Sequence, residues 1–387
     1  MSQWLLLLLP VAAMSGWWVA RRQLGREGHN GSDLSSNYFK GLNYLLNEQP
    51  DKAIEVFIRM LEVDSETVET HLALGNLFRR RGEVDRAIRI HQNLIARPTL
   101  NRQQRTQALL ELGQDYMRAG LLDRAETLFQ ELIDMNDHTE PALRHLIDIY
   151  QQEKEWGKAI VAIQKLELLT GIFKAPIIAH YHCELADLAL HNSDPELARH
   201  RASLALECDR NCVRASLLLA GIEMAEGDYK AALGNFKNIQ YQDADYLPEI
   251  VAPLLKCYSR LGMTGEIIDY LQQMLQKHNS ITLMLTLAEL LRAQQGDQQA
   301  ASFITEQLRK RPSVRGLDRL IELNLTLFEG DARDNLLILK DLIAKLLEGK
   351  PIYKCNNCGF AGKAMHWQCP GCKNWSSIKP IQGVEGE

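Results

Sequence analysis

Small residues recur through most of this 387-residue chain at intervals close to 34 residues. Successive alanines in one frame are separated by 34, 38, 34, 39 and 34 residues, at Ala53, Ala87, Ala125, Ala159, Ala198 and Ala232. Ala300 continues the frame two periods later. A glycine lies twelve residues before each of the first three alanines, at Gly41, Gly75 and Gly113. Periods of roughly 20–50 residues are typical of stacked supersecondary units, so we expect a solenoid.

Larger side chains occupy fixed places in the same frame. An apolar or ring side chain follows most of the alanines by four residues, at Phe57, His91, Phe129, Ile163, Phe236 and Ile304. Two antiparallel helices approach closely where a residue is small, and the ring fills the space to the next unit. The pattern is that of a tetratricopeptide array. We therefore predict an all-α, right-handed solenoid of about eight repeats across 35–310, degenerate near Ala202 and Ile267, and a last helical pair at about 316–349.

The most distinctive repeat reads GNLFRRRGEVDRA, from Gly75 to Ala87. Such arrays bind segments of other proteins on a curved surface built from the first helix of each unit. Asn76 and Arg79 fall at positions that face this surface, and Arg80 and Arg81 adjoin them. These four residues are a candidate site for acidic side chains or a partner carboxylate. The alternative is a solvated basic helix end, which suits the local helix dipole.

Four cysteines near the end of the chain form two Cys-x2-Cys pairs separated by ten residues, at Cys355, Cys358, Cys369 and Cys372. Two such turns can place four thiolates at the corners of a tetrahedron around Zn²⁺ or a single Fe ion. The spacing therefore predicts one metal ion, Fe or Zn, since four thiolates accept both. Two disulfides are the alternative, but eight cysteines in this length are too few for a disulfide scaffold.

An uncharged run, WLLLLLPVAAMSGWWVA, covers residues 4–20 and is followed by Arg21 and Arg22. It is close to the minimum length of a membrane-spanning helix. A cleaved signal peptide would carry its basic residues before the apolar run. The positive-inside rule places everything after residue 20 in the cytoplasm, where disulfides do not persist. The predicted organisation is an anchor at 1–20, a linker at 21–34, the solenoid at 35–349 and the four-cysteine domain at 350–387.

Other features of the sequence favour ordinary packing over chemistry. The chain has no phosphate-binding glycine loop, HExxH pair or serine nucleophile elbow, so we assign no catalytic residue and expect a non-enzyme. The net charge of −5 gives no reason to expect nucleic acid as a partner. Cys208-x3-Cys212 and the run from His180 to Cys183 are expected to pack within helices. The tail aromatics, Trp367 and Trp375 among them, are expected to pack around the metal loops.

Four stretches of the sequence resemble the lipopolysaccharide assembly protein B family of Gram-negative bacteria. They are LPVAA at 9–13, LGNLFRRRGEVDRAIRIHQ at 74–92, DYMRAGLLDRAE at 115–126, and the tail YKCNNCGF…WQCPGC…WSSIKPI. The likeness covers essentially the whole chain. The tail is similar to the knuckles of rubredoxin, which implies that its four cysteines are the metal ligands. Its ten-residue gap is shorter than that of a free-standing rubredoxin.

The resemblance implies a non-enzymatic, single-pass adaptor of the bacterial inner membrane, with a periplasmic N-terminus and a cytoplasmic bulk. It implies control of lipopolysaccharide synthesis through turnover of the committed-step lipid A deacetylase by a membrane ATP-dependent protease. Those two proteins, other lipopolysaccharide-assembly membrane proteins and the inner membrane are the implied partners. Two alternatives are a redox protein with an Fe(Cys)₄ centre and a general scaffold for envelope assembly.

Overall fold

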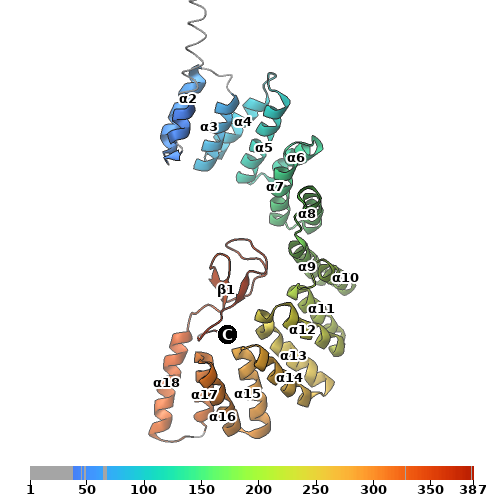
Figure 1. Cartoon of the computed structure of the whole chain (residues 1–387), viewed down its shortest axis with the longest axis vertical. Coiled ribbons are helices and arrows are strands. Elements are labelled where there is room, and N and C mark those ends of the chain that lie inside the picture. Colours follow the sequence, from blue (N-terminus) through green and yellow to red (C-terminus); the bar gives the residue numbers. More distant parts are fainter. Residues whose placement is uncertain (1–37, 45, 48, 64–67, 327, 385) are drawn as a thin grey trace, which may run out of the picture. The chain divides into compact units, whose positions relative to one another are not determined.

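The computed structural model describes residues 38–44, 46–47, 49–63, 68–326, 328–384 and 386–387. Most of these residues are helical, and a small β-sheet forms near the end of the chain (Figure 1). The chain divides into two compact units, residues 1–172 and 173–387. The predicted anchor at 1–20 and linker at 21–34 lie outside the described residues. None of the helices in the described ranges has the length and apolar character needed to cross a membrane.

Unit 1 is a row of antiparallel helices in which each helix packs on the next. The helices are α2 (Pro50–Val63), α3 (Val68–Arg81), α4 (Val84–Ile95), α5 (Arg102–Arg118), α6 (Leu122–Asp134), α7 (Thr139–Gln152) and α8 (Trp156–Thr170). The first helices of neighbouring pairs also touch, α3 with α5 and α5 with α7. This stacking confirms the predicted tetratricopeptide-type array.

The repeat frame explains why the helices pair where they do. Ala87 and Ala125 have no exposed surface. A Cβ added to Gly113 would lie 2.6 Å from the ring of Phe129, and one added to Gly75 would lie 2.4 Å from the ring of His91. Only glycine permits so close an approach, so the small residue and the ring four positions after the alanine fix these two helix pairs.

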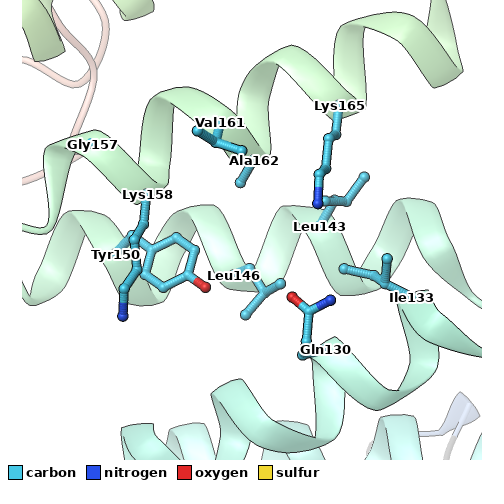
Figure 2. A pocket seen from close by; sticks show the side chains of 10 residues that line it. All are labelled: Gln130, Ile133, Leu143, Leu146, Tyr150, Gly157, Lys158, Val161, Ala162 and Lys165. Atoms are coloured by element: carbon cyan, nitrogen blue, oxygen red, sulfur yellow. The ribbon is translucent and has the colours of Figure 1, made fainter.

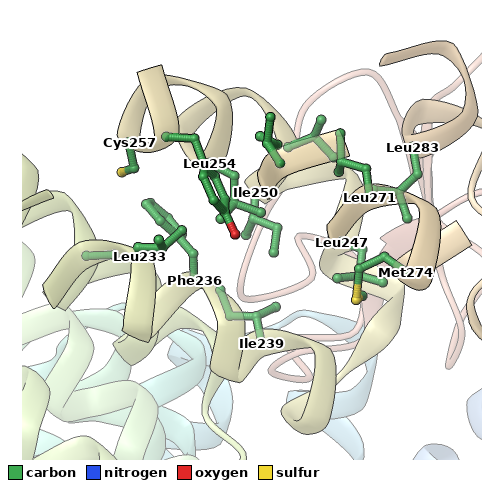
Figure 3. Close-up of a cluster of buried hydrophobic side chains, with 14 of the residues drawn as sticks. Leu233, Phe236, Ile239, Leu247, Ile250, Leu254, Cys257, Leu271, Met274 and Leu283 are labelled. Atoms are coloured by element: carbon green, nitrogen blue, oxygen red, sulfur yellow. The ribbon is translucent and has the colours of Figure 1, made fainter. Parts of the chain in front are cut away.

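Unit 2 continues the same helical pattern. Its helices are α9 (Ala175–His191), α10 (Pro195–Cys208), α11 (Val213–Glu226), α12 (Tyr229–Gln242), α13 (Leu247–Leu261), α14 (Thr264–Lys277), α15 (Ile281–Gln295), α16 (Asp297–Lys310), α17 (Val314–Asn324) and α18 (Asp331–Leu347), with a 3-10 turn η2 (Ala244–Tyr246) before α13. A large apolar cluster spans α11 to α15 (Figure 3). The two degenerate repeats pack normally, because Ala202 is fully buried and Ile267 nearly so.

Three short strands follow α18. They are β1 (Tyr353–Cys355), β2 (Ala361–Gly362) and β3 (Ile378–Pro380), in the order β2-β1-β3 with both pairs antiparallel. Cys355 pairs with Ile378, and both are buried together with Cys369. So small a sheet has almost no apolar core of its own. Its stability therefore depends on its other attachments.

Candidate metal centre and its seat on the helical array

The four tail cysteines converge on one point. The sulfurs of Cys355, Cys358, Cys369 and Cys372 all lie within 4.8 Å of one another. Cys355 Sγ lies 3.7 Å from Cys372 Sγ, and Cys358 Sγ lies 3.6 Å from Cys369 Sγ. A tetrahedron with metal–sulfur bonds of about 2.3 Å has edges of about 3.8 Å. The separations therefore fit the four thiolates of a single tetrahedral ion.

Matching turns present the two cysteine pairs. The N–H of Gly359 donates to the carbonyl of Cys355 at 3.0 Å, and the N–H of Lys373 donates to the carbonyl of Cys369 at 2.9 Å. The residue after each pair adopts positive φ, +80° at Gly359 and +60° at Lys373. Each turn thus aims both of its sulfurs at the same point, a geometry set by local sequence alone.

The donor set is that of a metal module and not of a disulfide pair. All four cysteines are free thiols, with sulfurs far beyond the roughly 2.05 Å of a disulfide bond. Thiolate ligands suit Zn²⁺ and Fe, and a small domain of this kind gains folding free energy from the ion. The four clustered cysteines indicate one metal ion. We call residues 353–380 the metal module.

The metal module lies against unit 2 through its two tryptophans. Trp375 stacks on His180 of α9, with ring centroids 4.9 Å apart. Trp367 packs on Tyr246 of η2 at 5.3 Å. The expectation that these aromatics pack around the metal loops is therefore wrong for both tryptophans. Only a few residues, such as Phe360, pack inside the module.

Polar contacts fix the same interface. The hydroxyl of Tyr353 donates to Glu249 of α13 at 2.5 Å, and the hydroxyl of Tyr246 donates to the carbonyl of Ile378 at 3.2 Å. Lys379 forms an ion pair with Asp243. These bonds tie the central strand β1 and the outer strand β3 of the tail sheet to the η2–α13 region of the array.

His180 is neutral at this interface. Its Nε2 lies 2.7 Å from Ser376 Oγ. Burial, followed by the nearby Arg214 guanidinium, lowers the pKa of His180 to about 3. The ring therefore serves as a packing and hydrogen-bonding surface. The sequence predicts ordinary helix packing for the run from His180 to Cys183. Nothing local could indicate a contact with a residue 196 positions away.

The residues after β3 make a second attachment. Glu387 is buried, and its carboxylate accepts hydrogen bonds from Ser280 Oγ at 2.9 Å, from the N–H of Thr282 at 3.0 Å and from the Thr282 hydroxyl. Arg315 of α17 donates to the same carboxylate at 2.5 Å. The tail therefore crosses from the metal module to the start of α15 and to α17.

Replacing Glu387 by glutamine is expected to loosen this attachment. Burial opposes ionisation, but the bonds from Thr282 and the charge of Arg315 outweigh it, and the pKa of Glu387 lies below its usual range. Its stabilising contribution is thus present above about pH 4.3 and is lost as the pH falls through the lowered pKa. We expect the free energy of local opening, measured by hydrogen exchange of residues 381–384, to fall by about 1.5–3 kcal/mol.

The matched control for that change is Glu306→Gln, which removes an exposed carboxylate paired with Lys310. An exposed pair contributes little, so exchange of residues 381–384 should not change. Equal protection of the tail in the Glu387→Gln chain and the parent would contradict the attachment.

In unit 1, two of the four predicted partner-binding residues form ion pairs with carboxylates of the same chain. Arg79 donates to Asp115 Oδ1 at 2.8 Å and to Glu111 Oε2 at 2.6 Å. Arg81 pairs with Asp51 at 2.5 Å and with Glu83 at 3.1 Å. Arg80 is exposed on α3. The Oδ1 atom of Asn76 is buried and has no hydrogen-bond partner in the described part of the chain.

Sequence reasoning missed a small cleft beside α7 and α8. It has a volume of about 280 Å³, and Leu146, Tyr150, Val161 and Lys165 contribute to its walls (Figure 2). Gln130 and Ile133 of α6 lie at one end of it (Figure 2). The volume is at or below the low end of small-molecule sites. It is large enough for one or two side chains of another protein.

The remaining cysteines do not form a second metal cluster in the described ranges. Cys183 and Cys212 are buried with their sulfurs 3.8 Å apart, in an apolar cluster with Ala179 and Ala205. Cys208 is exposed at the end of α10. Cys183 and Cys212 are buried like small apolar side chains, as expected from the sequence, whereas the expected packing of Cys208 is wrong because that residue is exposed.

A metal module of four cysteines seated on a tetratricopeptide array defines a non-enzymatic protein of the adaptor type. Residues 353–380 match the rubredoxin metal binding domain. Residues 70–106, 110–168 and 183–245 match tetratricopeptide repeats, and 254–278 match a PPR repeat. The chain is 40% identical over 388 residues to lipopolysaccharide assembly protein B of Escherichia coli strain K12, and 36% identical over 399 residues to that of Haemophilus influenzae. Each match covers 100% of both chains. The chain belongs to the lipopolysaccharide assembly protein B family.

Proposed function

We propose that this chain is an inner-membrane adaptor that regulates lipopolysaccharide biosynthesis. The full-length identity to relatives named for lipopolysaccharide assembly carries this proposal. In the proposed mechanism, the chain promotes turnover of the committed-step lipid A deacetylase by a membrane ATP-dependent protease. Residues 1–20 anchor the chain in the membrane, 21–34 form a linker, 35–349 form the array, and 350–387 hold one Zn²⁺ or Fe ion.

The position of the metal module supports different roles for the two units. Its contacts fall on His180 of α9 and Glu249 of α13, and Glu387, which follows the module, contacts Thr282 of α15. These three are the first helices of their pairs. That is the surface with which such arrays bind other proteins. In unit 2 the chain therefore covers it with its own module. We assign partner binding to the first helices of unit 1, where Arg80 of α3 offers an exposed cation.

Membrane anchoring gives the mechanism its efficiency. A single anchor at residues 1–20 would confine the array to the layer beside a membrane protease. Confinement raises the effective concentration of the two proteins without any new contact between them. The adaptor then needs only weak contacts with protease and substrate.

Replacement of Cys355 and Cys358 by serine in the chromosomal copy tests the function. We expect loss of the metal and a rise in the cellular level of the deacetylase, because an adaptor with a disordered module no longer presents substrate. Cys208→Ser is the control, since Cys208 is exposed and distant from the cluster in sequence. An unchanged deacetylase level in cells whose adaptor has lost its metal would overturn the proposal.

A further inference from the structure

Helix α18, the last helix before the metal module, carries a row of exposed apolar side chains. Ile338 is 59% exposed, Leu342 is 51% exposed and Leu346 is 59% exposed. Leu339, beside them, is 49% exposed. With 3.6 residues per turn, residues four apart lie on the same side of a helix. These four side chains therefore form one continuous apolar strip, the α18 arc.

A different side of the helix packs against the array. Ile343 is buried, and Leu336 and Leu347 are half-buried. Within the described chain, α17 is the one element in extensive contact with α18, and Figure 1 draws α18 beside it at the end of the row. The second helix of an earlier pair, such as α10, α12 or α16, touches both its own partner and the first helix of the next pair. Helix α18 lacks the second of these contacts.

An end helix of this kind should be polar on its outer side. Solenoids need terminal units with polar outer faces, because an apolar end invites further stacking. Large contiguous apolar patches on a protein surface mark interaction sites. We therefore expect another molecule to cover the α18 arc.

We propose that the α18 arc is covered by the same arc of a second copy of this chain, with the two α18 helices antiparallel. The charges on the helix support this orientation. Asp331 and Asp334 lie in its first turn, and Lys345, which lies 2.7 Å from Asp341 of the same helix, lies in its last. Antiparallel pairing brings the acidic start of each helix to the basic end of the other, whereas parallel pairing would bring like charges together.

The sequence also sets a register for the pair. A two-fold axis at Leu342 places Ile338 opposite Leu346 of the second copy, because each lies four residues from the axis. A two-fold contact needs one surface that complements itself, and the α18 arc meets that condition in its apolar positions.

One helix pair is a small interface. It buries less than the about 800 Å² per partner of a standard stable complex. We therefore expect a reversible, concentration-dependent dimer. The inference does not rest on the proposed role in lipopolysaccharide synthesis, and it holds for any membrane-confined or soluble form of the chain.

Cross-linking of the full chain in native membranes tests the contact. Leu342→Cys should give a covalent dimer with a short bismaleimide, because the two residues meet at the axis. Leu337→Cys is the matched control: Leu337 lies on the same helix and is 47% exposed, but it is outside the arc. Its yield should equal the background from the native cysteines. Chains with Ile338→Cys and chains with Leu346→Cys should cross-link to each other more than to themselves.

Sedimentation of the purified full chain gives a second measurement. We expect the parent and Leu337→Glu to shift from monomer to dimer as concentration rises, and Leu342→Glu to remain monomeric. Dimers that persist in Leu342→Glu, or a parent that is monomeric in both experiments, would overturn the proposal. If the parent is monomeric and Leu342→Glu instead loses binding to lipid vesicles or to a different protein, the arc has another occupant and the proposal fails.

Discussion

Replacing Cys369 by serine is expected to unfold residues 353–380 while leaving the helices of the array folded. Cys369 is fully buried at the centre of the metal module, and its sulfur lies 3.6 Å from that of Cys358. Apparent binding free energies of structural zinc sites are roughly 10–16 kcal/mol, far more than a three-stranded sheet without a core can replace. Metal content should fall from about one ion per chain to none.

Unfolding of the metal module should be visible in the fluorescence of its tryptophans. Trp375 and Trp367 pack on His180 and Tyr246, so release of the module should shift their fluorescence to that of solvated indole. Far-ultraviolet circular dichroism should stay close to that of the parent, because the helices keep their own contacts. Cys208→Ser should leave both signals unchanged. Full metal content in the Cys369→Ser chain, or a parent without metal, would show that the cluster is not a metal site.

The second large effect is expected at Asp115. This carboxylate is fully buried in unit 1, where it contacts His91 Nδ1 at 2.5 Å and accepts from Arg79 at 2.8 Å. Asp115→Ala leaves the arginine and the histidine without their shared partner. Breaking a buried ion pair by removing one side costs about 3–5 kcal/mol. We expect the free energy of local opening of α3, α4 and α5, measured by hydrogen exchange, to fall by that amount.

Two further variants distinguish the loss of this buried network from a general loss of stability. Glu140→Ala removes one side of an exposed pair with Arg144 and should cost at most about 1 kcal/mol. Asp115→Asn keeps the shape of the side chain and removes its charge, so a smaller loss is expected than in Asp115→Ala. If Asp115→Ala costs no more than Glu140→Ala, the buried network does not hold the α3–α5 region together.

The sequence is sufficient to predict the parts of the structure that are determined by local or periodic contacts. The 34-residue frame predicts the helix pairs because small residues recur where the helices must approach, and in the first units a glycine meets a ring, as Gly113 and Phe129 do. The spacing of the tail cysteines predicts the cluster, because each Cys-x2-Cys turn orients its own pair of sulfurs. Both predictions depend on interactions within a few tens of residues.

The sequence was insufficient where distant residues meet. His91 falls in the frame at a position otherwise held by an apolar side chain, but its partner Asp115 lies on the next unit, 24 residues away. The site for Trp375 is formed by His180, in another element altogether. No local pattern marks either partner, since each is an ordinary residue until the fold brings it into place. The same holds for the bonds between Glu387 and Thr282.

The contact between Ser376 and His180 has a consequence for how the chain is made. Helix α9 leaves the ribosome before its partners in the metal module have been made, because Ser376 lies 196 residues after His180. Contacts so remote in sequence form late in folding. Completion of unit 2 therefore waits for the end of synthesis and for delivery of a metal ion, so a shortage of that ion would leave newly made chains with an uncovered aromatic surface, open to chaperones and proteases.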